Sequence, residues 1–260
     1  MSNIKNASFD KTTCISEVLA FFKGQVNINK IQYNDNFEDT IKAMNEIMAK
    51  YFYLYFSINE SNGEDNKRGR GFYLRQYLCA IINNHYGLKD FFQKGLQVQV
   101  HLLLRNQFEF INALIAFIGD DDNYSNVSSV IDESTITPGN TKSKRALKKI
   151  FEKQGKEKFK KVWSDFENRY DFLYSNLSDT SHGNLFKVSM FSFNGDEANV
   201  DVIRPALGGG YKPMGQAINI LEEALDYFDE IFIMLFAELY KKGYFNKKSD
   251  QYKILLQLLQ

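Results

Sequence analysis

The sequence predicts an all-α fold, a helical bundle with a small β-hairpin inserted near residues 186–204. Three observations lead to this prediction. The 260 residues include only three Pro, the residue that most strongly disrupts a helix interior. Apolar side chains recur at steps of three and four residues along most of the chain, as in amphipathic helices. The chain also carries 23 Phe and 15 Tyr, enough for one large core, so we expect a single helical domain over residues 1–260.

The N-terminal part predicts a short helix followed by a longer one. Residues 1–34 should form an N-terminal arm with a short helix from Thr12 to Lys23, which Gly24 ends. The next helix should extend from Phe37 to Tyr55, because its apolar residues fall on one face.

The central part contains the longest helical pattern of the chain. A third helix is expected from about residue 72 to 84, ending before Gly87. Residues 88–118 then continue the helical periodicity, with a break near Gly95. Residues 120–140 are rich in Ser, Asp and Asn, so we expect a flexible loop there.

The C-terminal half predicts further helices and the hairpin. Residues 142–161 are strongly basic and should form one helix or a pair, and an aromatic helix follows them. Apolar and polar residues alternate within 186–204, where Asn194–Gly195 is a strong signal for a two-residue turn. Residues 215–242 form the most amphipathic long helix, and a C-terminal helix is expected within 246–260.

Charge and composition exclude several classes of protein. The 32 basic and 32 acidic residues cancel, so no overall field attracts the chain to nucleic acid or to a membrane. The polar N-terminus lacks the apolar core of a signal peptide, and no apolar stretch is long enough to span a membrane. We therefore expect a cytoplasmic protein without a membrane partner, with buried free thiols at Cys14 and Cys79.

The first candidate site is a polar stripe within an apolar helical pattern. Gln97, His101, Arg105 and Glu109 are spaced by four residues, so they share one helix face. Their neighbours are apolar, which places the stripe near or inside the core, where an unpaired charge is costly. Arg105 could bind a phosphate or a carboxylate, with Glu109 orienting it. Alternatively, the two residues form an internal ion pair that braces the bundle.

The second candidate site is a polar cluster at the expected end of the aromatic helix. It contains Ser178, Asp179, Ser181 and His182, and Gly183 follows. In one interpretation His182 caps the helix, where the helix dipole favours its charged form. In the other, His182 is a general acid or base, because histidine titrates near neutral pH. The Ser and Asp side chains would then supply orienting hydrogen bonds.

Other patterns predict no metal and no cofactor. The three His residues are scattered, and no spacing typical of a metal site is present. Residues 208–210 are three Gly without the Lys and Ser or Thr of a phosphate-binding loop. The basic residues of 142–161 are typical of a solvated helix face; together with residues 67–70 they form the place where RNA would bind.

Two segments together resemble an uncharacterised bacterial all-α family. In that family an LLRxxxE helix precedes a helix that ends in YxxLSxxxH. The resemblance covers roughly residues 70–240, and the matching positions are Arg105, Glu109, Tyr174, Ser178 and His182. Such proteins are similar in layout to HEPN-type helical bundles, which occur in phage-defence and toxin–antitoxin contexts and include metal-independent ribonucleases. A HEPN ribonuclease carries its Arg shortly before its His on one helix, so the resemblance implies that Arg105 takes this place from another helix.

The first functional hypothesis is therefore a HEPN-like protein of antiviral defence or of a toxin–antitoxin pair that cleaves RNA without a metal. Arg105 would hold the phosphodiester, His182 would act as general acid or base, and Glu109 or Asp179 would orient the imidazole. The residues expected to contribute to binding are Tyr174, Ser178 and His101. This hypothesis predicts that Arg105 and His182 lie within hydrogen-bonding or one-water reach of each other.

The alternative hypothesis is a non-catalytic interaction or regulatory protein. In it the same residues form a structural polar network, and the 215–242 helix mediates homo-oligomerisation or binds a partner protein. A third hypothesis is a sensor of a small ligand or nucleotide that uses the aromatic-lined interior of the bundle.

Overall fold

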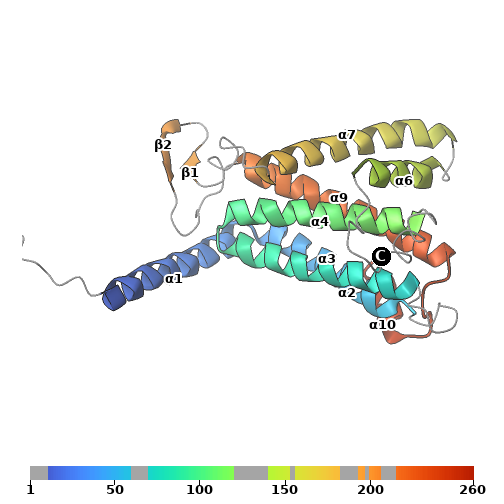
Figure 1. Cartoon of the computed structure of the whole chain (residues 1–260), viewed down its shortest axis with the longest axis horizontal. Helices are drawn as coiled ribbons and strands as arrows, with labels where there is room; N and C mark the ends of the chain where they lie inside the picture. The colour runs from blue at the N-terminus through green and yellow to red at the C-terminus, as the bar shows by residue number, and fades with distance from the viewer. Residues whose placement is uncertain are drawn as a thin grey trace, which may run out of the picture.

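A computed structural model confirms the all-α prediction. The structure describes residues 11–59, 70–119, 140–152, 156–181, 193–196, 199–205 and 215–260. Within these ranges it contains eight helices and two short strands (Figure 1). The elements are α1 (Lys11–Asn36), α2 (Glu38–Ser57), α3 (Arg70–Gln93), α4 (Gln97–Gly119), α6 (Asn140–Glu152), α7 (Lys156–Ser181), β1 (Phe193–Asp196), β2 (Asn199–Pro205), α9 (Gly215–Lys241) and α10 (Asp250–Gln257).

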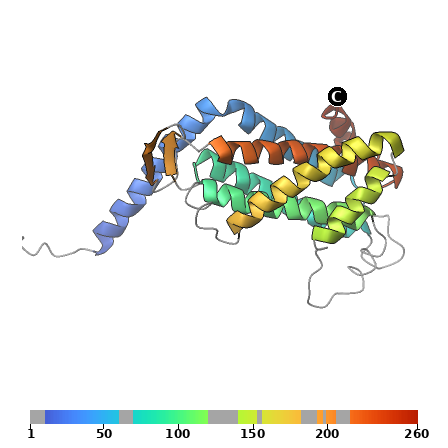
Figure 2. The same ribbon diagram turned by 90° about the horizontal axis from the view of Figure 1, so that it is seen from above.

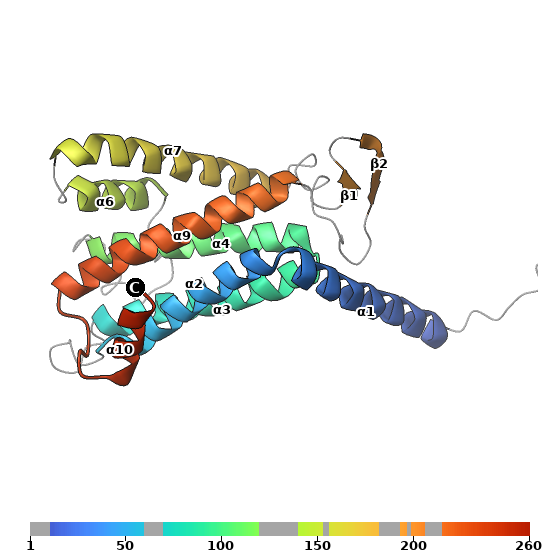
Figure 3. The same ribbon diagram turned by 180° about the vertical axis from the view of Figure 1, so that it is seen from behind.

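The helix α4 occupies the middle of the bundle. It contacts α3, α6, α7 and α9, and α6 and α7 lie together on one side of it while α2 and α3 lie on the other (Figure 1). From behind, α9 crosses α4 (Figure 3). α1 contacts α2 and α3 through its C-terminal part, and the rest of this helix projects away from the bundle (Figures 1 and 2).

The core is one contiguous cluster of buried apolar side chains drawn from all eight of these helices. Its aromatic centre is Tyr227 of α9, whose ring lies 5.2 Å from that of Phe108 and 5.3 Å from that of Phe166. The Tyr227 hydroxyl donates a hydrogen bond of 2.5 Å to Asn112. α9 buries thirteen residues in all. Its apolar face is therefore used inside the bundle, and binding of a partner through residues 215–242 stays a prediction that this face does not support.

The first helix is longer than predicted. α1 passes through Gly24 without interruption, although we expected Gly24 to end it. A glycine costs a helix interior only about 1 kcal/mol relative to alanine, and contacts further along stabilise the helix. Asn29 donates a hydrogen bond of 2.8 Å to the Lys94 backbone oxygen. The Tyr33 hydroxyl accepts one of 2.9 Å from Gln97.

The predicted stop at Gly87 is also wrong, because α3 continues through it. Gly87 instead permits close packing: a Cβ at this position would lie 3.3 Å from Leu103 of α4. Asn84, one turn earlier, donates a hydrogen bond of 2.8 Å to the Leu103 backbone oxygen. The predicted break near Gly95 is confirmed. Gly95 adopts a φ of 73°, and its N–H donates to the Phe92 oxygen at 2.8 Å, closing the end of α3.

The two strands pair antiparallel, but the predicted turn is in the wrong place. Asn194–Gly195 lies within β1, and Asp196 pairs with Asn199, so only two residues separate the strands. The pairing is irregular between Asn194 and Asp196. Residues 182–192, where the first predicted strand begins, and residues 120–139, where the flexible loop was predicted, lie outside the described residues.

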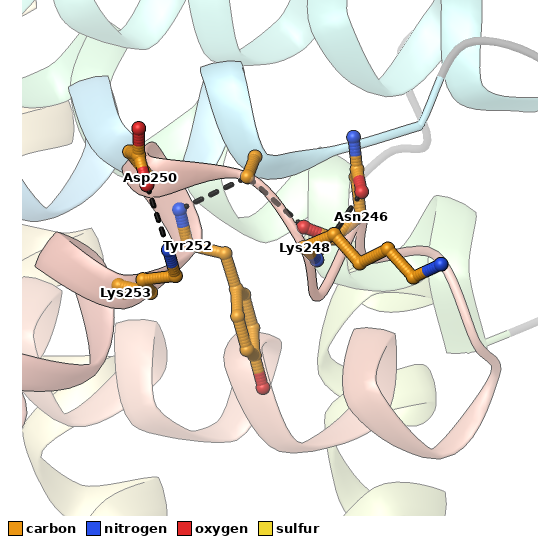
Figure 4. A network of polar contacts seen from close by, with 6 residues as sticks. Asn246, Lys248, Asp250, Tyr252 and Lys253 are labelled. Atoms are coloured by element: carbon orange, nitrogen blue, oxygen red, sulfur yellow. Dashed lines mark hydrogen bonds and ion pairs between the residues drawn. The ribbon is translucent and has the colours of Figure 1, made fainter.

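The C-terminal segment closes one end of the bundle. Ser249 caps α10, because its hydroxyl accepts a hydrogen bond of 3.1 Å from the Tyr252 N–H and donates one of 2.9 Å to the Asn246 oxygen (Figure 4). Phe245 pairs with Ile58 at the end of α2 in an antiparallel bridge. The C-terminal helix expected within 246–260 therefore forms at α10 and is attached to α2.

Two further expectations concern the surface. Across the described helices, none combines the length and apolarity that crossing a membrane requires. Cys79 is a free and exposed thiol, which corrects the prediction of a buried one. Its apolar neighbour Leu78 is fully buried, so Cys79 lies on the outward side of α3. The side chain of Cys14 lies outside the described residues.

Candidate functional site

Arg105 lies where α4 meets α7. Its side chain is only 11% exposed, and its Nε and Nη2 both lie 2.7 Å from Oε1 of Glu109. Nη1 donates a hydrogen bond of 3.2 Å to the Tyr174 backbone oxygen. The guanidinium carbon lies 4.4 Å from the centre of the Tyr174 ring, a cation–π contact. Each nitrogen of the guanidinium therefore has a partner within the protein.

The antiparallel packing of α4 and α7 creates this arrangement. Arg105 meets Tyr174, while Phe108, three residues further along α4, meets Tyr170, four residues earlier on α7, with ring centres 5.0 Å apart. The burial of Tyr170 raises its pKa above the ordinary range. We call the group of Arg105, Glu109 and Tyr174 the Arg105 cluster.

The polar stripe on α4 is only partly inside the core. Gln97, His101 and Arg105 are buried as predicted, but the Glu109 side chain is 48% exposed. The stripe therefore lies partly inside the core and partly at its edge, as the expectation that it lies near or inside the core allows. The position is physically favourable, because a carboxylate that keeps part of its hydration avoids most of the desolvation cost of a buried charge.

His101 is used within its own helix. Its Nδ1 lies 2.8 Å from the Gln97 backbone oxygen. Because a carbonyl oxygen only accepts, the proton is assigned to Nδ1. The Gln97 side chain in turn donates to Tyr33 of α1. The stripe thus divides, with Gln97 turned toward α1 and Arg105 toward α7.

The second predicted cluster is described only in part. Ser178 lies one turn beyond Tyr174 on α7 and is half-buried. α7 ends at Ser181, seven residues past Tyr174, which is about 10 Å along the helix axis. The Asp179 side chain and the whole of His182 lie outside the described residues. The predicted closeness of Arg105 and His182 therefore stays a prediction.

The structure also reveals buried polar residues that the sequence analysis did not single out. His85 on α3 is almost fully buried, with its Nε2 2.9 Å from the Met44 backbone oxygen. Burial lowers the pKa of His85 to about 4, against the opposing effect of the Met44 hydrogen bond. Asn112 is buried beside Tyr227. The signal that identified Arg105, a polar residue inside the apolar run of α4, would also have identified Asn112.

A groove of about 530 Å³ runs along the surface between α7 and α9. Arg169 of α7 forms ion pairs with two glutamates of α9. Its Nε lies 3.3 Å from Oε2 of Glu223, and its Nη1 lies 3.0 Å from Oε2 of Glu230. Burial raises the pKa of Glu230, and Arg169 opposes this shift. Among the residues that the structure describes, no predicted site residue lines the groove; the described lining residues are Asn168, Arg169, Phe172, Asn219, Glu222, Glu223 and Asp226.

In the part of the chain that the structure describes, no group of three or more His, Cys, Asp or Glu residues is placed to hold a metal ion. The basic run is divided between α6 and the start of α7. Within it, Lys144 forms ion pairs of 2.9 Å with both Glu167 and Asp171 of α7. Lys144 therefore links α6 to α7, and its charge is neutralised by these two acidic residues.

Comparison with protein-family models, with curated proteins and with solved structures finds no match to this chain. The resemblance to the bacterial all-α family and to HEPN-type bundles therefore stays a prediction.

Proposed function

We propose that this protein is a non-catalytic interaction or regulatory protein that binds other proteins through α1. The observation that carries this proposal is the apolar surface of α1 where it projects from the bundle (Figure 2). Seven large apolar side chains on this helix are between 41% and 64% exposed. They are Ile15, Val18, Leu19, Phe21, Phe22, Ile28 and Ile31. Four of the seven, Ile15, Val18, Leu19 and Phe22, share one side of the helix and form a contiguous apolar face, which is typical of a binding site for another protein.

The Arg105 cluster supports the same proposal. To bind a phosphate, Arg105 would have to release Glu109, since both Nε and Nη2 contact this carboxylate. The third nitrogen and the face of the guanidinium are used by Tyr174. The cluster is therefore better suited to brace α4 against α7 than to hold a substrate.

A second candidate function is the HEPN-like, metal-independent ribonuclease of a defence or toxin–antitoxin system. One observation favours it: Glu109 is half exposed, so rotation of this side chain would open Arg105 to an anion. Ser178 lies on α7 between Tyr174 and Ser181, the last residue of the helix. This function requires the chain after Ser181 to turn back about 10 Å toward Tyr174.

The aromatic interior favours packing over ligand binding. The rings of Phe108, Tyr170 and Tyr227 contact one another, with centres 5.0 to 6.2 Å apart. Ring contacts at such distances are typical of a filled core. We therefore do not propose a sensor that binds a ligand at this point.

The interaction function can be tested in the cells that make the protein. A photo-activated cross-linking residue placed at Leu19, which is 64% exposed on α1, should give a discrete cross-linked protein. The matched control is Tyr86 on α3, which is 67% exposed outside the α1 surface. A lack of product from Leu19, or the same products from both positions, would contradict a binding role for α1.

The ribonuclease function can be tested with purified protein and total RNA in EDTA. We expect RNA to remain intact with the wild-type chain, with Arg105→Ala and with His182→Ala. Cleavage by the wild-type chain that both substitutions abolish would overturn the non-catalytic proposal and establish the second candidate. The EDTA keeps contaminating metal-dependent nucleases inactive.

A further inference from the structure

We propose that the partner of α1 is a second copy of this chain, and that the two α1 helices pair antiparallel across a seam formed by Ile15, Val18, Leu19 and Phe22. This inference rests on the proposed function, because it names the partner that α1 binds. It does not depend on whether the Arg105 cluster has any catalytic role.

The seam continues a face that already packs within the molecule. Its four residues are spaced by three, one and three, so they share one side of α1. The same side leads through the half-buried Val26 to the fully buried Asn29 and Tyr33. Asn29 and Tyr33 contact the bundle through Lys94 and Gln97. The packing face of α1 therefore extends beyond the part of the bundle that covers it.

The exposed area matches what a dimer needs. The four seam residues are between 41% and 64% exposed. Half of a large apolar side chain is roughly 100 Å², so the seam presents on the order of 400 Å² of apolar surface. Apolar atoms contribute about 60% of a typical interface, which gives roughly 700 Å² in each copy. Stable interfaces bury about 800 Å² in each partner.

The seam is complementary to itself. With a two-fold axis between residues 18 and 19, Val18 faces Leu19 of the second copy and Ile15 faces Phe22 of the second copy. A larger side chain thus meets a smaller one at each level of the seam. Glu17 and Lys23, the two charged residues in this stretch of α1, are not seam positions, so closing the seam buries no charge.

The position of the bundle selects the antiparallel arrangement. Paired helices lie about 8–10 Å apart, whereas each bundle is several helices across and lies at one end of α1 (Figures 1 and 3). In a parallel pair the two bundles would have to occupy the same space. In an antiparallel pair they lie at opposite ends, and each α1 reaches toward the bundle of the other copy.

The first experiment is sedimentation equilibrium of the full chain. We expect a dimer whose dissociation constant rises at least about a hundredfold in Leu19→Glu, since symmetry places the new charge in the seam twice. The matched control is Ile31→Glu, on the opposite side of the same helix and 62% exposed, which should leave the dimer unchanged. Circular dichroism verifies that both variants fold. A monomeric wild-type chain, or equal weakening by both substitutions, would overturn the proposal.

The second experiment tests the register in a Cys14→Ser, Cys79→Ser background. A mixture of Ile15→Cys and Phe22→Cys chains should form a disulfide, because these positions face each other. Ile15→Cys alone should not, because the two copies of residue 15 lie about 10 Å apart along the seam. Cross-linking of Ile15→Cys with itself would overturn the antiparallel pairing. A monomeric purified chain whose Leu19 cross-links to a different protein in cells would overturn this inference and leave the proposed function standing.

Discussion

Arg105 shows how an apolar helix accommodates a charge. Its guanidinium stacks on the Tyr174 ring and pairs with Glu109, which lies at the surface. The charge is thereby neutralised without a second buried ion, which avoids most of the desolvation cost that a fully buried pair carries. At the residue scale, the cluster functions as a link between α4 and α7.

Replacing Arg105 should therefore cost more than replacing its ionic partner. We expect Arg105→Ala to lower the free energy of unfolding by about 2 kcal/mol, because it removes both the packing on Tyr174 and the hydrogen bonds. Glu109→Gln should lower it by less than about 1 kcal/mol, because this side chain is half exposed and the pair is partly hydrated. Urea denaturation measures both. An equal loss in the two variants would show that the ion pair, and not Tyr174, holds the helices together.

His85 should make the stability of the protein depend on pH. Its pKa is lowered to about 4 in the folded state by burial, against about 6.5 in the unfolded chain. Between these values only the unfolded chain binds the proton, so stability is highest above pH 6.5 and falls as the pH is lowered toward 4. The expected loss from this group at pH 5 is about 2 kcal/mol.

The control for His85 is His85→Gln, whose side-chain amide can still donate to the Met44 oxygen. Urea denaturation of both proteins from pH 7 to pH 5 separates this group from all the others that titrate. We expect the wild-type chain to lose more stability than the variant over this range. Identical pH profiles would show that His85 is not buried as a neutral group.

Glycine has two different effects on the helices of this protein. Gly24 and Gly87 lie inside helices that continue through them, whereas Gly95 and Gly243 adopt φ values of 73° and 74° just beyond helix ends. At the end of α9, the Tyr244 N–H donates to the Leu239 oxygen, and the Gly243 N–H donates to the Tyr240 oxygen, each at 3.1 Å. In this protein a glycine therefore ends a helix only where it adopts the left-handed conformation, which allows backbone N–H groups just beyond the helix to donate to its last carbonyl oxygens.

At the element scale, this difference predicts opposite effects of one substitution. Gly243→Ala should lower the free energy of unfolding by about 1–2 kcal/mol, because a Cβ is unfavourable in the left-handed region. Gly24→Ala should not destabilise the protein, because a Cβ there meets nothing within 4 Å and alanine favours a helix. Thermal denaturation tests the first change, and slower amide exchange in α1 tests the second. A stable Gly243→Ala variant would contradict the left-handed end of α9.

At the scale of the whole molecule, the buried apolar residues form one cluster, from Tyr33 in α1 to Leu255 in α10. The single tryptophan, Trp163, is buried in α7 with its ring 5.4 Å from that of Phe151 in α6. Because α6 and α7 share the core with the other helices, the prediction of a single domain implies that these two helices do not unfold separately from the rest.

This implication is measurable with two probes. Unfolding followed by Trp163 fluorescence and by circular dichroism should give the same midpoint and the same slope in urea. The fluorescence reports the contact of α6 with α7, whereas the circular dichroism reports all helices together. Two separate transitions would show that α6 and α7 form an independent unit, and the single-domain prediction would then be wrong.

Part of the candidate site was predictable and part was not. A spacing of four residues is enough to place Arg105 beside Glu109 on one face of a helix. It does not say which neighbouring helix covers that face or how far, so only the structure shows that Arg105 is buried while Glu109 is half exposed. Tyr174 was named as a candidate only because it matches the family pattern. Its contact with Arg105 follows from the packing of α7 on α4.

The sequence by itself determined the all-α class and the polar stripe on α4, because periodicity and spacing are local properties of a helix. Only the tertiary structure decided that α9 buries its apolar face while α1 exposes one. Both helices carry apolar residues, and an apolar face does not specify its own partner. Which of them meets the core depends on where the rest of the chain lies, and that depends on contacts between residues far apart in sequence.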